Sequence, residues 1–106
     1  MEAVSQDEFA DRVLDAEPPV IVEFWAEWCG PCKMVTPVLE ALETRHPQLR
    51  FVRVDVDDES EIARACRVTS IPALLVFERG TVQRRVVGAL PKATLLEELG
   101  PWIDDD

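Results

Sequence analysis

The stretch Val20 to Ala26, VIVEFWA, is apolar at every position except Glu23. A short run that is apolar at consecutive positions is typical of a strand buried on both faces. Glu23 conflicts with such surroundings, because a buried carboxylate is costly unless it is paired or takes up a proton. The run therefore predicts a buried strand and marks Glu23 as a candidate functional residue, the alternative being a solvent-facing Glu on an edge strand.

The spacing of apolar residues, together with capping, proline and glycine signals along the chain, predicts alternating helices and strands. Ser5 and Glu8 have the spacing of a capping box, so a helix should begin at Ser5 and bury Phe9, Val13 and Leu14. The other expected helices cover Cys32–Arg45, Asp57 to about Cys66, and a segment that starts near Pro91 and ends or bends at Gly100-Pro101. The expected strands are Val20–Ala26, Phe51–Val56, Ala73–Glu78 and Thr81–Val87, with a possible short one at Glu2–Val4.

The order of these elements predicts an α/β fold. Strands separated by helices pair in parallel through crossovers, whereas the tight turn Arg79-Gly80 joins the last two strands as an antiparallel hairpin. The result is a mixed sheet with helices on both faces. At 106 residues, the chain has the length of a single domain, residues 1–106.

Charge and hydropathy exclude several classes of partner. Lys and Arg number 11 against 21 Asp and Glu, a formal net charge of −10, which repels nucleic acid and anionic membranes. The chain has no apolar run near the roughly 18 residues of a membrane span. Its start, MEAVSQDEF, lacks the basic and apolar regions of a signal peptide. We therefore expect a protein that stays in the cytoplasm and binds neither membranes nor nucleic acid.

Three cysteines, Cys29, Cys32 and Cys66, are too few for a secreted disulfide framework. Cys29 and Cys32 are three apart where the buried strand passes into a helix, so they lie close enough to form a disulfide. Helix N–H groups favour a thiolate at Cys29, while Cys32, further in, would be the shielded, resolving thiol. A structural disulfide, or half of a zinc site completed by Cys66 and His46, remains an alternative.

The two remaining candidate groups have ordinary interpretations. Cys66 falls late in the expected third helix, among Ile62, Ala63 and Val68, and is interpreted as a buried, inert residue. A regulatory thiol is the alternative for this residue. His46 is interpreted as a helix-end residue without a catalytic role.

The stretch from Trp28 to Lys33, WCGPCK, follows an apolar strand, and Ser70-Ile71-Pro72 comes some forty residues later. With these motifs the chain resembles the thioredoxin family over essentially its whole length. The resemblance implies the thioredoxin fold, a central mixed sheet of four to five strands flanked by four helices. It also implies a thiol–disulfide oxidoreductase that reduces protein disulfides without a metal or organic cofactor.

The resemblance assigns roles to four residues near the reaction. Cys29 is the nucleophile that attacks a substrate disulfide, and Cys32 resolves the mixed disulfide. Glu23 occupies the position of a buried acid, usually Asp, that exchanges protons with the resolving cysteine. Arg53 stands where the family usually has Lys, and could grip Glu23 with two hydrogen bonds that hold it ionised.

The resemblance also implies a binding surface and partners. Pro72 should be a cis-proline that faces the cysteines. The residues that match the family's apolar docking surface are Trp28, Gly30, Pro31, Ile71, Pro72, Val87, Gly88 and Ala89. The expected partners are disulfide-containing proteins and a thioredoxin reductase as electron donor, with the chain acting as a monomer. The alternative is a binding or scaffold protein that uses the surface around Trp28 and Pro72 without redox turnover.

Overall fold

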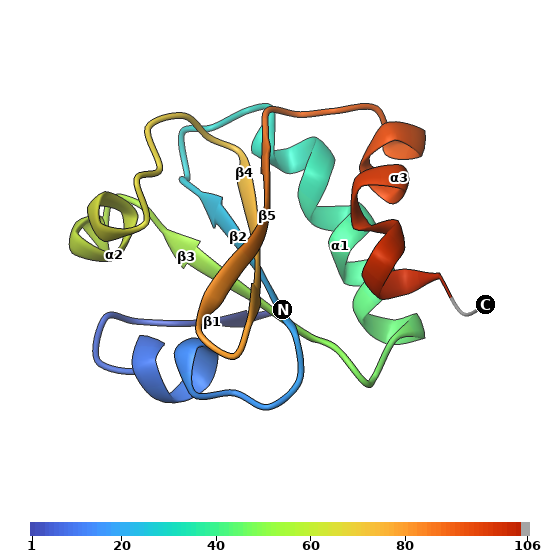
Figure 1. Ribbon diagram of the computed structural model, residues 1–106. Coiled ribbons are helices and arrows are strands. Elements are labelled where there is room, and N and C mark those ends of the chain that lie inside the picture. The colour runs from blue at the N-terminus through green and yellow to red at the C-terminus, as the bar shows by residue number, and fades with distance from the viewer. Residues whose placement is uncertain (105–106) are drawn as a thin grey trace.

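The architecture is that of a twisted sheet between two layers of helices, as seen in the computed structural model, which describes residues 1–104 (Figure 1). The strands are β1 (Glu2–Ala3), β2 (Val20–Trp25), β3 (Arg50–Asp55), β4 (Ala73–Glu78) and β5 (Thr81–Val87). They form one sheet in the order β1-β3-β2-β4-β5. The central strand β2 is parallel to β3 and antiparallel to β4.

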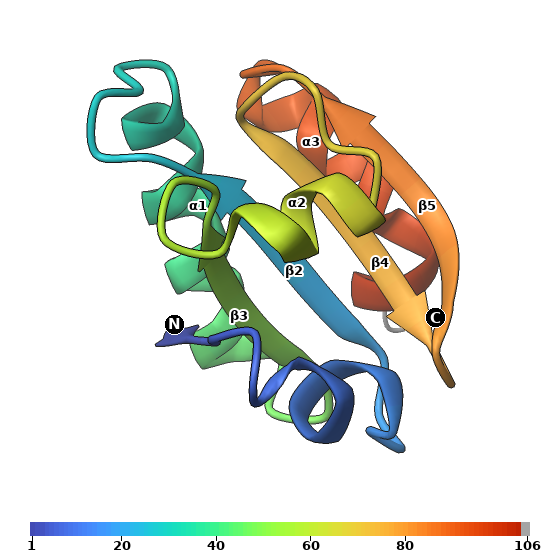
Figure 2. The ribbon, with the colours of Figure 1, turned by 90° about the vertical axis from the view of Figure 1, so that its left-hand side faces the viewer.

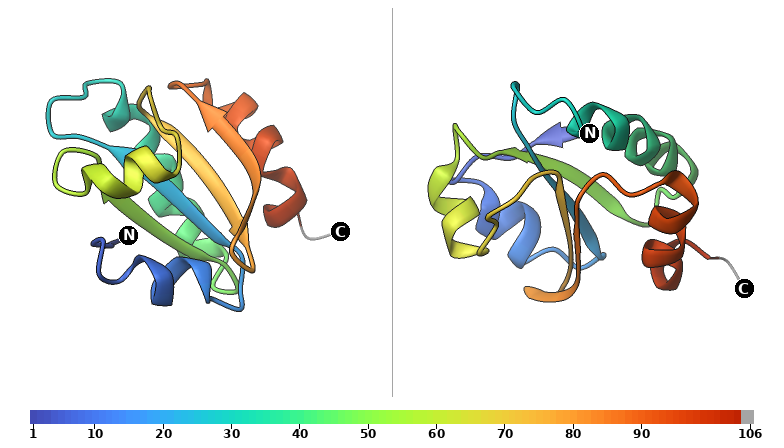
Figure 3. Two further views of the ribbon diagram at one scale, coloured as in Figure 1. Left: turned by 60° about the vertical axis from the view of Figure 1, so that its left-hand side comes forward. Right: turned by 90° about the horizontal axis from the view of Figure 1, so that it is seen from above.

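The helices are η1 (Ala10–Leu14), α1 (Cys32–Arg45), α2 (Ser60–Ala65) and α3 (Lys92–Ile103). Helices η1 and α2 cover one face of the sheet, and α1 and α3 cover the other (Figures 1 and 2). Figure 3 shows the same two layers, separated by the twisted strands, from two further directions. The predicted α/β fold, a mixed sheet with helices on both faces, is confirmed.

Several predicted elements have the bounds that the sequence indicated. Helix α1 and strands β4 and β5 begin and end at the expected residues. The turn between β4 and β5 uses Arg79 and Gly80 at φ 51° and 81°, so the antiparallel hairpin is confirmed. Strands β2 and β3 each end one residue early, and β3 also begins one residue early, at Arg50, because Arg50 pairs with Val20.

The first helix differs from the prediction. Ser5 and Glu8 do form a capping contact, with Glu8 Oε1 accepting the Ser5 backbone N–H at 3.1 Å. The regular helix nevertheless begins later and has the wide π geometry, in which the Asp15 N–H bonds to the Ala10 oxygen. Leu14 is 37% exposed rather than buried, because it lies about a quarter of a turn beyond the buried Val13.

Helix α2 also starts later than predicted. The acidic residues Asp57 to Glu59 form turns, and the helix begins at Ser60. The cause is Asp55 at the end of β3, whose Oδ1 accepts the backbone N–H groups of Asp57 and Asp58 at 2.8 and 3.2 Å. These hydrogen bonds to the Asp55 side chain stabilise a turn at Asp57 and Asp58 and replace helical backbone hydrogen bonds there.

The sequence predicted that Gly100-Pro101 would end or bend the last helix, but the helix does not end there. Helix α3 continues through both residues to Ile103, and the Asp104 N–H bonds to the Gly100 oxygen at 2.9 Å. Proline lacks an N–H and normally disfavours a helix interior. Here Leu99, Gly100 and Ile103 are all buried against the sheet, so tertiary packing outweighs the local cost.

Three connections meet at one end of the sheet, above the C-terminal end of β2 (Figure 1). They are the loop from β2 to α1, the loop that enters β4, and the loop that leaves β5. The carboxyl ends of parallel strands are the usual place for a site in an α/β sheet. The fold therefore brings residues 26–31, 67–72 and 88–91 together from distant parts of the sequence.

Candidate active site

The cysteine pair lies where β2 passes into α1. Cys29 is in the loop and Cys32 is the first residue of the helix, with their Cα atoms 5.4 Å apart and their sulfurs joined in a disulfide. The loop already winds as a helix, since the Lys33 and Met34 N–H groups bond to the Gly30 and Pro31 oxygens. Both cysteines are buried, at 3% and 2% exposure, so shielding does not distinguish them in the oxidised form.

The backbone does distinguish the two sulfurs. The Cys32 N–H points at Cys29 Sγ, at 3.2 Å. The first N–H groups of a helix have no partner within the helix and carry its positive dipole end. When the disulfide opens, this N–H donates to a Cys29 thiolate and stabilises it. The geometry thus favours Cys29 as the ionised, attacking sulfur.

The predicted docking residues gather around this pair. Trp28 is 69% exposed, and its indole N–H donates to Asp57 Oδ2 at 2.8 Å. Ile71 packs against the cysteines, and the Ile71–Pro72 peptide bond is cis. The Gly88 N–H donates to the Pro72 oxygen at 2.8 Å, which joins the loop that enters β4 to the loop that leaves β5. Gly30, Pro31, Val87 and Ala89 are exposed in the three loops or next to them.

A cavity of about 360 Å³ extends this surface beside the tryptophan. It is lined by Trp28, Val56, Val68, Thr69, Ser70 and Ile71. Gly88, whose N–H bonds to the Pro72 oxygen, has a φ of +100°, a backbone conformation that favours glycine. The surface is mainly apolar and backbone-lined, which suits an extended peptide more than a charged small molecule.

Glu23 lies in the middle of β2 and is fully buried, at 0% exposure. The alternative of a solvent-facing Glu on an edge strand is therefore wrong. Burial raises the pKa of the Glu23 carboxyl, and this effect outweighs the hydrogen bond from Thr36 and the charge of Arg53, which lower it. The raised pKa extends the pH range over which the carboxyl can hold a proton, and such a group can exchange a proton with a neighbour.

Arg53 does not make the double hydrogen bond that the sequence suggested. Its Nε lies 3.9 Å from Glu23 Oε1, and neither atom has a hydrogen-bond partner within residues 1–104. The guanidinium instead stacks on the ring of Trp25, 3.9 Å from the centroid. Glu23 and Trp25 project from the same face of β2, so the ring lies beside the carboxyl and competes for the cation.

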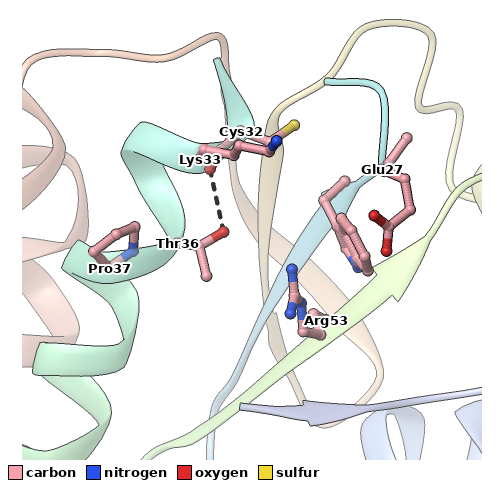
Figure 4. A pocket seen from close by; sticks show the side chains of 8 residues that line it. Glu27, Cys32, Lys33, Thr36, Pro37 and Arg53 are labelled. Carbon is pink, nitrogen blue, oxygen red and sulfur yellow. Dashed lines mark hydrogen bonds between the residues drawn. The ribbon is translucent and has the colours of Figure 1, made fainter. Parts of the chain in front are cut away.

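Thr36 is the polar neighbour that sequence reasoning missed. Its Oγ1 donates to Glu23 Oε2 at 2.6 Å and also lies 3.1 Å from the backbone oxygen of Cys32. A cavity of about 260 Å³ opens beside it, lined in part by Cys32, Thr36 and Arg53 (Figure 4). The sequence did hold a signal, because Thr36 is four residues after Cys32 and so lies on the same side of α1.

The other candidates lie away from this centre. Cys66 packs against the core but is half-buried rather than buried as predicted, and burial raises the pKa of its thiol, which disfavours the reactive thiolate. His46 is buried at the C-terminal end of α1, with Nδ1 3.4 Å from the Gln48 amide. Within residues 1–104, no cluster of three or more His, Cys, Asp or Glu side chains could hold a metal ion. No helix in the same range is long and apolar enough to cross a membrane.

Comparison with known proteins gives one consistent family. The thioredoxin family model matches residues 1–100. A thioredoxin of Mycobacterium tuberculosis is 50% identical over 97 residues, covering 91% of this chain and 84% of the relative. A thioredoxin of Streptomyces clavuligerus is 45% identical over 93 residues, with 88% and 87% coverage. A bifunctional thioredoxin reductase/thioredoxin of Mycobacterium leprae is 50% identical over 92 residues, which cover 86% of this chain and 20% of that protein.

Proposed function

Because the chain belongs to the thioredoxin family and is therefore a thiol–disulfide oxidoreductase, we propose that Cys29 attacks disulfides in protein substrates and Cys32 resolves the product. The observation that carries these roles is the hydrogen bond from the Cys32 N–H to Cys29 Sγ at the start of α1. It gives one of the two sulfurs a preformed donor for its negative charge.

The proposed reaction proceeds in two exchanges. The Cys29 thiolate attacks one sulfur of the substrate disulfide, forming a mixed disulfide while the other substrate sulfur leaves as a thiolate and takes up a proton. Cys32 then loses its proton and attacks Cys29 Sγ, which forms the Cys29–Cys32 disulfide and releases the second substrate thiol. The substrate gains the two electrons that the two cysteine sulfurs lose. Cys32 gives up one proton, and the substrate thiolates take up their protons from the solvent.

The surface around the cysteines supports a polypeptide substrate. Ile71 packs against the cysteines, and Trp28 precedes Cys29 in the chain. Trp28 and Val87 are among the large apolar residues that are exposed in the structure. Exposed apolar side chains that cluster at a concave site mark a binding surface. A segment of a protein that carries a disulfide would lie across them, between the loop that enters β4 and the loop that leaves β5.

Glu23 is the proposed proton acceptor for Cys32 during the second exchange. The carboxyl is buried in β2, and its contact with Thr36 connects it to the first turn of α1, where Cys32 lies. Its raised pKa brings it closer to the pH at which a thiol must give up a proton. Arg53 would tune this group through its charge at 3.9 Å rather than through a hydrogen bond.

The dithiol must be regenerated, and we propose that a thioredoxin reductase does this. The fused reductase/thioredoxin of Mycobacterium leprae supports the pairing of the two activities. A reducing function also suits the cytoplasm, where thiols are kept reduced. The protein would act as a monomer, since each chain carries both sulfurs of the redox pair.

Two substitutions test the assigned roles. We expect Cys29→Ser to abolish reduction of a disulfide-containing protein, and Cys32→Ser to accumulate a mixed disulfide through Cys29, visible as a covalent adduct by mass spectrometry. Retention of biological function by Cys29→Ser would instead show that the protein acts by binding alone, as a scaffold. Adducts through Cys66 in Cys32→Ser, or through Cys32 in Cys29→Ser, would contradict the order of attack.

A further inference from the structure

Thr36 is the side chain that joins the buried Glu23 to the cysteine-bearing turn. Its Oγ1 contacts Glu23 Oε2 at 2.6 Å and the Cys32 backbone oxygen at 3.1 Å. We propose that Thr36 is a positioning residue that holds the Glu23 carboxyl for proton exchange with Cys32, and that its hydroxyl changes acceptor when Glu23 gains or loses its proton. The inference rests on the redox function proposed above.

Counting hydrogens shows why the hydroxyl must change acceptor. A threonine hydroxyl has a single hydrogen but can also accept. If Glu23 is ionised, the hydroxyl donates to the carboxylate and the Cys32 oxygen loses this donor. If Glu23 is protonated, the carboxyl donates to Oγ1 and Oγ1 donates to the Cys32 oxygen. In the oxidised protein, where Cys32 has already given up its proton, the protonated form of Glu23 makes a hydrogen bond of each short distance.

The surroundings of the carboxyl favour the same state. Glu23 Oε1 is buried and has no hydrogen-bond partner within residues 1–104, which is unfavourable for an ionised group. The charged groups around it act in both directions: Arg53 of β3 and the terminal ammonium favour the ionised form, and Glu40 of α1 opposes it. Its neighbour on β4 is the apolar Leu74. Thr36 is thus the one hydrogen-bond partner of the carboxyl within the described residues.

Thr36 also lies between the carboxyl and the cavity beside α1. Cys32, Thr36 and Arg53 line this cavity of about 260 Å³, whereas Glu23 is not among its lining residues (Figure 4). In the reduced protein, a proton that leaves Cys32 therefore reaches the ionised Glu23 carboxylate by way of the hydroxyl. A solvent water in the cavity takes the thiol proton and passes one to Oγ1, whose own hydrogen moves to Oε2. Cys32 is left as a thiolate and Glu23 as a neutral acid.

The test compares Thr36→Val, which keeps the shape but lacks the hydroxyl, with Thr36→Ser, which keeps the hydroxyl. In the oxidised protein, carbon NMR of the Glu23 carboxyl gives its titration midpoint directly, without any turnover. We expect Thr36→Val to raise the midpoint by about one pH unit, a tenfold change, because a hydrogen bond to a charged acceptor is stronger than one to a neutral group. Thr36→Ser should restore the original midpoint.

The pH–rate profile of disulfide reduction gives a second reading. Its Glu23-dependent limb should move to higher pH in Thr36→Val, as the Glu23 midpoint does, and should return to the wild-type position in Thr36→Ser. In a Glu23→Gln background, adding Thr36→Val should leave the profile unchanged, because Thr36 acts through Glu23. If Thr36→Val does not fold, Thr36→Ala, which removes the hydroxyl without adding volume, gives the same two readings.

Two outcomes would overturn the role of Thr36. One is an unchanged Glu23 midpoint in Thr36→Val, and the other is an equal shift of the profile with and without the Glu23 carboxyl. Either result would leave the assignment of Cys29 intact, because that assignment depends on the loss of turnover in Cys29→Ser. A Cys29→Ser variant that still reduces disulfides would instead remove the proposed function on which Thr36 depends.

Discussion

The two faces of the sheet are packed differently, although the same strands supply both. Within residues 1–104, the apolar face, covered by η1 and α2, contains a core cluster of hydrophobic side chains, among them Val22, Phe24 and Leu75. The mixed face, covered by α1 and α3, is apolar around Ile21 but carries Glu23 and Arg53 toward the cysteines. Because side chains alternate along a strand, β2 contributes a continuous core on one side and a titratable group on the other. Stability and chemistry can therefore be altered separately.

The largest expected effect comes from the apolar face. Leu75 is fully buried in the middle of β4, so Leu75→Ala leaves a cavity and should cost about 2–5 kcal/mol of the free energy of unfolding. Urea unfolding measures this cost. The rate of disulfide reduction by the remaining folded protein should stay as it was, because Leu75 belongs to the core on the face of the sheet opposite Glu23. A matching loss of rate would show that the two faces are coupled.

A smaller effect of opposite sign is expected on the mixed face. The pKa of Glu23 is raised above its ordinary value of 4.5 in the folded protein, so between the two values the folded state binds more protons than the unfolded state. Stability consequently falls as pH rises through this window, and the loss is complete above the folded pKa. Glu23→Leu removes the group, and we expect it to add about 1–3 kcal/mol at neutral pH while slowing reduction.

Urea unfolding at several pH values checks this expectation. The gain of Glu23→Leu should shrink toward pH 4, where the wild-type carboxyl is protonated in both states. Glu97→Gln, at an exposed carboxylate on α3, is the matched control and should change stability by less than about 0.5 kcal/mol. A gain that does not depend on pH would mean that shape, and not charge, limits stability on this face.

The smallest effect concerns Arg53. If its guanidinium is held by the ring of Trp25 rather than by Glu23, then Arg53→Lys loses a planar stack but keeps the charge. We expect a loss of about 0.5–1 kcal/mol, seen as a small fall in melting temperature, with the Glu23 titration almost unmoved. A large shift of that titration would assign the cation to the carboxyl instead.

Features that depend on local chemistry could be predicted from the sequence. Helix α1 begins at Cys32, directly after the tight Gly30-Pro31 turn, and the Arg79-Gly80 turn fixes the hairpin register nearby. The buried state of Glu23 also followed from its apolar neighbours. In each case, residues close in sequence determine the outcome, so pattern and turn rules are sufficient.

Features that depend on contacts between residues distant in the sequence could not be predicted from it. Helix α3 passes through Pro101 because its buried face packs on the sheet, a gain that no local rule includes. Whether the Arg53 guanidinium contacts Glu23 or Trp25 depends on how the side chains of β2 and β3 lie relative to one another. Thr36 was missed because its spacing from Cys32 indicates a shared side of α1 but no partner on β2, and its contact with Glu23 forms only when β2 and α1 are packed together.

The hydrogen bond from the Gly88 N–H to the Pro72 oxygen has a consequence for how such a surface can diversify. Main-chain atoms fix the spacing of the two loops, so the side chains of Ile71, Val87 and Ala89 are free to change without altering the frame that carries them. Single substitutions at these three positions could then change which substrate proteins bind, while the backbone around the cysteines stays the same.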